Sequence, residues 1–272
     1  MALTHLQRRI CRLVAENRLA SGESYVAGGA ALNELIAAPR VSRDVDLFHD
    51  TEEALATTWA LDRRLLEAQG FAVHVVRERP GFVEAEVGEE KELVLLQWVR
   101  DSAYRFFPLV RHDDLGLVLH PFDLATNKVL ALVGRLEVRD WMDVIQCHER
   151  IQPLGYLAWA ACGKDPGFSP ASILEHAARS SRYSAEEVAE LAFDGEKPDA
   201  AQLSSAWHVM LDEAREIVAA LPGAEAGRCV LSAEATLFAG APDRIREALA
   251  GSELRFHPGR IRGALPQLSK RP

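Results

Sequence analysis

Residues 28–48 read GGAALNELIAAPRVSRDVDLF, and the residue types in this stretch predict a turn, a short helix and a strand. The apolar residues 25–27 precede the two glycines and predict another short strand. Residues 30–37 suit a helix that Pro39 ends, and residues 41–49 suit the following strand. The sequence therefore places a Gly-Gly turn between a strand and a helix, close to a strand that carries two aspartates.

The two aspartates, Asp44 and Asp46, are two positions apart in the predicted strand and so share one face, while Val45 and Leu47 point to the other. Two carboxylates on one face repel each other unless a cation lies between them. Carboxylate oxygens are ligands that Mg²⁺ prefers, together with waters and nucleotide phosphates. The pair therefore predicts a site for Mg²⁺ or Mn²⁺, although an Asp-x-Asp pattern can also be a solvated strand edge.

Gly28 and Gly29 allow the backbone to approach a ligand closely at the positive end of the following helix. A turn of this kind can hold the phosphates of an NTP, although most Gly-Gly pairs are simple turns. A phosphate site beside a metal site is the arrangement used in phosphoryl and nucleotidyl transfer, where positioning and charge neutralisation do most of the catalysis.

These residues resemble the nucleotidyltransferases of the AbiEii/AbiGii toxin type, within the DNA polymerase β-like superfamily. The family pattern is GGTAL, then an arginine and a serine, then a DIDL strand. This chain has GGAAL at 28–32, Arg40, Ser42 and DVDL at 44–47. The family then has a lysine on a helix followed by R-D-x-x-D, and here NKVLALVGRLEVRDWMD supplies Lys128, Arg139, Asp140 and Asp143. The resemblance covers about residues 25–147.

The resemblance implies a two-lobed enzyme that transfers NMP from an NTP to an acceptor hydroxyl. The acceptor would be RNA, such as a tRNA end, and a cognate antitoxin protein would restrain the enzyme. Asp44 and Asp46 would hold the metal. The nucleotide would be bound by residues of both blocks: Gly28, Gly29, Ser42, Lys128 and Arg139. Lys128 suits this role because its ammonium is a compact charge on a long stem.

Asp140 and Asp143 are three apart on the predicted helix and so share a face, where one could accept the proton of the attacking hydroxyl. Asp140 directly follows Arg139, which we expect to hold it in a structural ion pair. Asp143 has no adjacent cation in the sequence. We therefore assign Asp143 the role of general base and give Asp140 the weaker claim to a catalytic role.

The chain departs from the family pattern at two positions. Ala30 replaces the threonine that often follows the glycines, and Gln97 occupies the position where the superfamily often has a third carboxylate. Glu84, Glu86 or Asp101 could replace that carboxylate, although all three also suit a charged surface. Two alternative functions therefore stay open: transfer to a small molecule or a protein hydroxyl, and nucleotide binding without catalysis.

The expected fold class is α+β, with a small mixed β-sheet core at 1–119 and a mainly helical lobe at 120–272. Further strands are predicted at 71–79, 82–87 and 93–100, and Asp50 with Glu53 predicts a capping box for a helix ending near Gly70. Helices are expected on both sides of Gly134 and at 154–162, 184–193 and 200–220. The tail 255–272 holds five Arg/Lys and no acid, which suits either a solubilising end or a strip that binds phosphates.

Composition limits the function classes. The chain has 272 residues, 31 Lys+Arg against 40 Asp+Glu and a net charge of −9, which argues against general charge-driven binding to nucleic acid. No apolar stretch is long enough for a membrane span or a signal peptide. The four cysteines have no metal-ligand spacing. We expect reduced thiols, a cytoplasmic location and no membrane partner.

Overall fold

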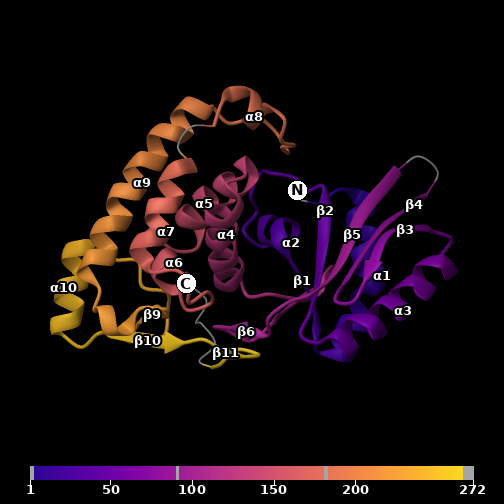
Figure 1. Cartoon of the computed structure of the whole chain (residues 1–272), viewed down its shortest axis with the longest axis horizontal. Coiled ribbons are helices and arrows are strands. Elements are labelled where there is room, and N and C mark those ends of the chain that lie inside the picture. The colour runs from indigo at the N-terminus through magenta and orange to yellow at the C-terminus, as the bar shows by residue number, and fades with distance from the viewer. Residues whose placement is uncertain (1–2, 90–91, 181–182, 266–272) are drawn as a thin grey trace. The chain divides into compact units, whose positions relative to one another are not determined.

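The computed structural model describes residues 3–89, 92–180 and 183–265 (Figure 1). The chain forms two compact units. The first contains residues 1–103, 109–120 and 192–195, and the second contains residues 104–108, 121–191 and 196–272. Two short segments, 104–108 and 192–195, thus belong to the unit that does not contain their neighbours in the sequence.

The first unit is built on a seven-stranded sheet with the order β3-β4-β5-β2-β1-β8-β7. Its strands are β1 (Ser24–Ala27), β2 (Asp44–His49), β3 (Ala72–Arg79), β4 (Phe82–Glu89), β5 (Glu92–Arg100), β7 (Val110–His112) and β8 (Gly116–Val118). β2 runs parallel to β5 and β1 parallel to β8, while the other neighbouring strands are antiparallel. The sheet is therefore mixed, as predicted.

Alternation along the central strands divides this sheet into two faces. The apolar face carries buried side chains at alternate positions: Val45, Leu47, Val83, Ala85, Leu96 and Trp98. The polar face carries half-buried side chains at the intervening positions: Asp44, Asp46, Glu84, Glu86 and Gln97. Helix α3 (Glu52–Ala68) packs on the apolar face, where Trp59 contacts Trp98 at 4.6 Å between ring centroids.

Helix α1 (His5–Ser21) packs against α3, and helix α2 (Gly28–Leu35) directly follows β1. The expected capping box at α3 is wrong. Thr51 is the N-cap, and its Oγ1 accepts a hydrogen bond from the backbone N–H of Ala54. Asp50 instead donates its backbone N–H to Glu23 O at the end of the β1–β2 pair, so the helix begins one residue later than predicted.

The second unit is mainly helical, as predicted. Its helices are α4 (Pro121–Arg135), α5 (Val138–Arg150), α6 (Leu154–Ala161), α7 (Pro170–Ala177), α8 (Ala185–Ala189), α9 (Ala200–Ala220) and α10 (Pro242–Ala250), with short 3₁₀ turns η1 (Ala178–Ser180) and η2 (Gly223–Glu225). All residues of α6 are buried, because this helix is apolar on every side. α6 contacts α4, α7 and α9 and forms the centre of the unit.

Four short strands complete the second unit: β6 (Tyr104–Arg105), β9 (Arg228–Ser232), β10 (Leu254–Pro258) and β11 (Arg260–Ile261). β10 pairs with β9, and β11 pairs with β6. The beginning of the basic tail is thus part of a paired strand, 254–258. Helix α7 was not predicted, although Ser169 as N-cap and Pro170 at the first helical position are ordinary start signals.

None of the helices in the described part of the chain is both long and apolar enough to cross a membrane.

Candidate active site

Asp44 and Asp46 lie two residues apart on the polar face of β2. Both side chains are half-buried, whereas Val45 and Leu47 between and beside them are 0% and 1% exposed on the apolar face. The buried alternation holds the register of β2, because a slip by one residue would move the aspartates into the core. The two carboxylates are therefore held on the same face, as their spacing predicts.

The start of α2 lies directly against this face. Gly28 has φ +66°, and a Cβ placed on it would lie 1.7 Å from Asp46 Oδ2. A side chain at this position would therefore clash with the carboxylate and strain the backbone. Ala27, the N-cap of α2, makes no side-chain capping bond, and the positive end of the helix lies against the Asp46 carboxylate.

Ser42 and Arg40 surround the same turn. Ser42 Oγ donates a hydrogen bond of 3.0 Å to Asp44 Oδ1, and the backbone O of Ser42 accepts one from Gln7 Nε2 at 2.9 Å. Arg40 is 6% exposed, and its Nη2 lies 2.5 Å from the position that a Cβ of Gly29 would take. Gly29 thus leaves space for a guanidinium beside the turn. No role was assigned to Arg40 from the sequence, although it belongs to the motif.

The neighbouring strands show where the other candidate acids lie. Gln97 of β5 is in register with Asp46 on one side and Glu84 of β4 on the other. Glu86 is in register with Leu95, which is in turn in register with Asp44, so an apolar residue separates Glu86 from that carboxylate. Asp101 follows β5 and donates its backbone N–H to His49 O. Among these three acids, Glu84 alone shares a register position with Asp46, with Gln97 between them.

The donor set fits a hard divalent cation. Asp44 and Asp46 offer carboxylate oxygens with the Ser42 hydroxyl beside them, and oxygen ligands of this kind suit Mg²⁺ and Mn²⁺ rather than Zn²⁺. Within residues 3–89, 92–180 and 183–265, no group of three or more His, Cys, Asp or Glu side chains is arranged to hold a metal ion. Further ligands would therefore have to be water, phosphate or a neutral side chain.

The second motif forms a buried ionic network inside the second unit. Lys128 of α4 places its Nζ 3.1 Å from Asp140 Oδ1 and 3.0 Å from Asp143 Oδ2, both on α5. Asp140 also accepts two hydrogen bonds from Arg135, at 2.6 Å from Nε and 2.9 Å from Nη2. Burial raises the pKa of Asp140, but the hydrogen bonds and charges of Arg135 and Lys128 outweigh it, so the pKa lies below its ordinary value.

The ion-pair partners of Asp140 and Asp143 differ from those expected from their sequence neighbours. Asp143 has no adjacent cation in the sequence, but it is 1% exposed and ion-paired with Lys128 from another helix. The cations that pair with Asp140 are Arg135 and Lys128, whereas Arg139 places its Nε 2.6 Å from Glu137 Oε2. Sequence neighbours were misleading because both cations, Lys128 and Arg135, come from the preceding helix α4. Trp141, between the two acids on α5, is fully buried in the core.

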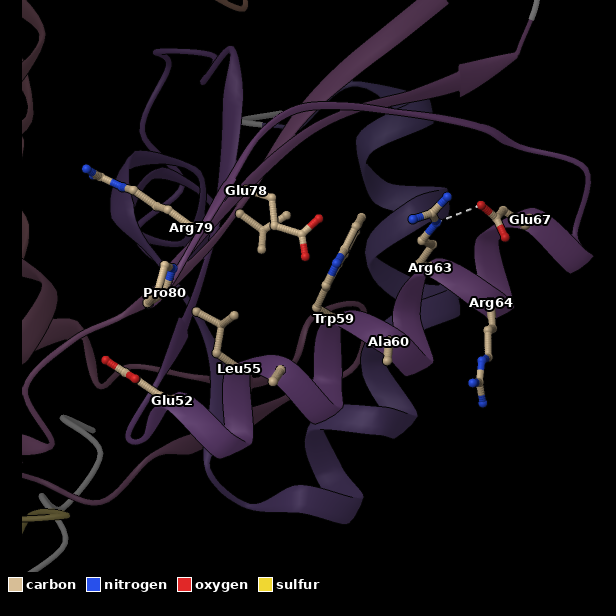
Figure 2. Close-up of a pocket in the computed structure, with 13 residues that line it drawn as sticks. Glu52, Leu55, Trp59, Ala60, Arg63, Arg64, Glu67, Glu78, Arg79 and Pro80 are labelled. Atoms are coloured by element: carbon tan, nitrogen blue, oxygen red, sulfur yellow. Dashed lines mark hydrogen bonds and ion pairs between the residues drawn. The ribbon is translucent and has the colours of Figure 1, made fainter.

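A groove of about 810 Å³ lies elsewhere in the first unit, between α3 and the β3–β4 hairpin (Figure 2). Leu55 and Trp59 line it from the helix, and Val83 lines it from the sheet. Arg63 at its rim is paired with Glu67. Val83 and Trp59 belong to the apolar-face side, so this groove is separate from the turn that holds Asp44 and Asp46.

The described part of the basic tail extends to residue 265. Arg255, Arg260 and Arg262 are exposed there, and β11 pairs with Tyr104 and Arg105. His257 anchors the tail, because its ring stacks on Phe107 and its Nε2 lies 2.8 Å from Phe106 O. Residues 266–272, which contain the last basic residues, lie outside the described residues.

Comparison with known proteins gives a match in fold and none in sequence. No protein-family model matches the chain, and no curated protein matches it. Among solved structures, a "putative nucleotidyltransferase" from H. pylori matches with a TM-score of 0.51 and 15% identity, over 79% of this chain and 95% of that one. JHP933 from Helicobacter pylori gives 0.50 and 13%, over 78% and 91%.

A third solved structure, MenT4, the nucleotidyltransferase toxin Rv2826c from Mycobacterium tuberculosis H37Rv, has a TM-score of 0.44 and 15% identity, over 80% of this chain and 83% of that one. The two Helicobacter structures show that this chain shares their fold, and one of them is described as a nucleotidyltransferase, in agreement with the fold predicted from the motifs.

Proposed function

We propose that this chain is a metal-dependent nucleotidyltransferase that moves NMP from an NTP to an acceptor hydroxyl. The observation that carries the proposal is the contact between the start of α2 and the acidic face of β2. Gly28, which has no room for a side chain, brings the helix N-terminus to the Asp46 carboxylate. A positive helix end suits phosphate, and the acidic pair suits the cation that accompanies a triphosphate.

Each candidate site residue of the first unit has a specific role in the proposed reaction. Asp44 and Asp46 hold Mg²⁺ or Mn²⁺, and Ser42 keeps the Asp44 carboxylate oriented through its 3.0 Å hydrogen bond. The backbone N–H groups of Gly28 and Gly29 bind phosphate oxygens. When bound, the cation neutralises charge that develops on the transferring phosphate. The residues themselves contribute by fixing the donors in place before the substrate arrives.

The reaction needs one bond made and one broken. The acceptor hydroxyl oxygen bonds to the α-phosphorus, the bond from that phosphorus to the bridging oxygen of the β-phosphate breaks, and pyrophosphate leaves. Asp143 accepts the hydroxyl proton, with Lys128 holding its Oδ2 at 3.0 Å. Lys128 and Arg139 contribute positive charge for the nucleotide phosphates. The roles in the second unit follow from the motif resemblance.

The acceptor is proposed to be RNA, such as a tRNA end, and the enzyme to be the toxin of a cytoplasmic toxin–antitoxin pair with a cognate antitoxin as its partner. This finer assignment rests on the two motif blocks. The net charge of −9 favours a small-molecule or protein hydroxyl as the second candidate acceptor. The neutral Gln97 favours a third possibility, a nucleotide-binding protein without catalysis.

Label transfer separates these three functions. Each of the four α-³²P-labelled NTPs is incubated with the protein and Mg²⁺ or Mn²⁺, in the presence of total tRNA, a panel of small hydroxyl compounds or the protein alone. Labelled tRNA supports the proposal, and label in another acceptor supports the second candidate. NTP binding by calorimetry without any label transfer would contradict catalysis. The Asp44→Asn/Asp46→Asn double variant is the negative control.

A further inference from the structure

A row of three polar side chains crosses the polar face of the sheet through strands β2, β5 and β4. Asp46 is in register with Gln97, and Gln97 is in register with Glu84. All three side chains are half-buried. Since neighbouring strands lie roughly 4.8 Å apart, Gln97 occupies the position between the two carboxylates. Its amide N–H groups can therefore donate to either carboxylate.

The structure shows which carboxylate receives them. Gln97 Nε2 donates a hydrogen bond of 2.8 Å to Glu84 Oε2. An ionised carboxylate only accepts hydrogen bonds, so the end of the amide that faces Glu84 must be the NH₂ group. The carbonyl oxygen Oε1 is at the other end of the planar amide. The oxygen and nitrogen of a planar amide point in different directions, so Oε1 is directed away from Glu84, and the register neighbour of Gln97 on its other side is Asp46.

We propose that Glu84 is a positioning residue that fixes the Gln97 amide so that its Oε1 offers a neutral oxygen beside Asp46. This inference rests on the proposed function, in which Asp44 and Asp46 hold a divalent cation. Amide carbonyl oxygens are suitable ligands for hard cations. A neutral oxygen extends the donor set without placing a third negative charge beside two carboxylates that already repel each other.

Glu84 matters because the alternative orientation of the amide is harmful. Without the Glu84 acceptor, the NH₂ group of Gln97 can turn toward Asp46 and donate to the oxygens that the cation needs. A donor in that position would also repel the cation. The negative charge of Glu84 thus acts through Gln97, and Glu84 itself need not touch the metal.

Glu86 provides a matched control on the same strand. It has the same charge and lies on the same face as Glu84, but its register neighbour on β5 is Leu95. A Glu86→Gln variant therefore removes an equal charge at a similar position without altering the orientation of Gln97. Any general electrostatic effect on cation binding will appear in both variants, whereas a positioning effect will appear only at Glu84.

The test measures binding of Mn²⁺ alone to the full-length protein by electron paramagnetic resonance, with folding checked by circular dichroism and melting temperature. Glu84→Gln should weaken Mn²⁺ binding about tenfold, the lower end of the range for partners that orient a metal ligand. Glu86→Gln should stay within about twofold of the parent. The double variant Glu84→Gln/Gln97→Glu reverses the hydrogen bond and should restore Mn²⁺ binding to the parent affinity or better.

Unchanged Mn²⁺ affinity in Glu84→Gln, an equal loss in Glu86→Gln, or no recovery in the double variant would overturn the inference. Asp46→Asn separates this failure from failure of the proposed function. If Asp46→Asn loses Mn²⁺ binding while Glu84→Gln keeps it, only the positioning role is wrong. If Asp46→Asn binds Mn²⁺ as the parent does, the metal site itself is wrong, and the role of Glu84 falls with it.

Discussion

The two units each contain a pair of aspartates close together in sequence, but the surroundings of the pairs differ. Asp44 and Asp46 are half-buried on a sheet face, with a hydroxyl and a helix N-terminus beside them. Asp140 and Asp143 are 0% and 1% exposed and share the ammonium of Lys128. The first pair offers carboxylate oxygens on a sheet face, and the second pair is bridged by the ammonium of Lys128.

The comparison teaches that spacing alone does not identify the task of an acidic pair. A separation of two on a strand and of three on a helix both place carboxylates on one face. The deciding factor is which charges the fold brings to that face. Lys128 lies twelve residues before Asp140 on another helix, so this neighbour becomes evident only when α4 and α5 pack together.

The largest expected effect is at the first pair. Asp46→Asn should reduce nucleotidyl transfer by on the order of a thousandfold or more, because the cation loses a charged ligand. The fold should stay intact, and the apo melting temperature should be equal or slightly higher, since one of two repelling charges is gone. Label transfer and thermal melting measure the two effects. Transfer near the parent rate would show that Asp46 is not a metal ligand, and the proposed difference between the two pairs would be wrong.

The second largest effect is a loss of stability in the other pair. Asp140→Asn removes the carboxylate that accepts from Arg135 and Lys128 and should destabilise the protein by about 3 kcal/mol, the low end for a broken buried ion pair. We take the low end because Arg135 is 45% exposed. Chemical denaturation measures this loss. Asp212→Asn, which breaks an exposed pair with Arg215, is the control and should change stability by less than about 0.5 kcal/mol.

Asp143→Asn tests whether the second pair also takes part in chemistry. We expect single-turnover transfer to fall by about a hundredfold while NTP affinity stays nearly unchanged, because a general base acts on the transferring proton and hardly on the bound ground state. Since Asp143 also holds Lys128, affinity must be measured separately by calorimetry. A normal single-turnover rate would place the base elsewhere and make both acids of this pair structural.

Lys128→Ala removes the cation that the second pair shares. NTP binding should weaken by roughly 1.5–3 kcal/mol, the scale of a charge-assisted contact, and NMP binding should weaken less. The reason is that the proposed contact is to the outer phosphates. Calorimetry with NTP and NMP, on samples shown to be folded, measures the difference. Equal losses for both ligands would mean that Lys128 serves only Asp140 and Asp143.

Sequence reasoning predicted what depends on local order and missed what depends on packing. The strand alternation around Val45 and Leu47 predicted the shared face of Asp44 and Asp46, and the glycine pair predicted the tight start of α2. The partners of Asp143 and the alignment of Gln97 with Glu84 could not be predicted, because they depend on which helices and strands become neighbours. Helix α7 was missed even though Ser169-Pro170 is a local start signal.

The smallest expected effect uses pH to probe the first unit while leaving the second pair unchanged. His49 is fully buried, its Nε2 is 3.1 Å from Ser24 Oγ, and burial lowers its pKa from 6.5 to about 4. Below about pH 6.5 the His49 ring takes up a proton in the unfolded chain but not in the folded chain. The contribution of His49 to the free energy of unfolding is therefore fully present above about pH 6.5 and falls as the pH drops. The loss between about pH 7 and pH 5 should be about 2 kcal/mol. Asp140, whose pKa is lowered, keeps its stabilising charge over this range and loses it only as the pH falls below the ordinary range of an aspartate.

Urea denaturation at the two pH values measures the loss in the parent and in His49→Gln, which lacks the titrating group. The variant should lose about 2 kcal/mol less than the parent, and an equal loss in both would show that the pH response arises outside the buried pair of Ser24 and His49.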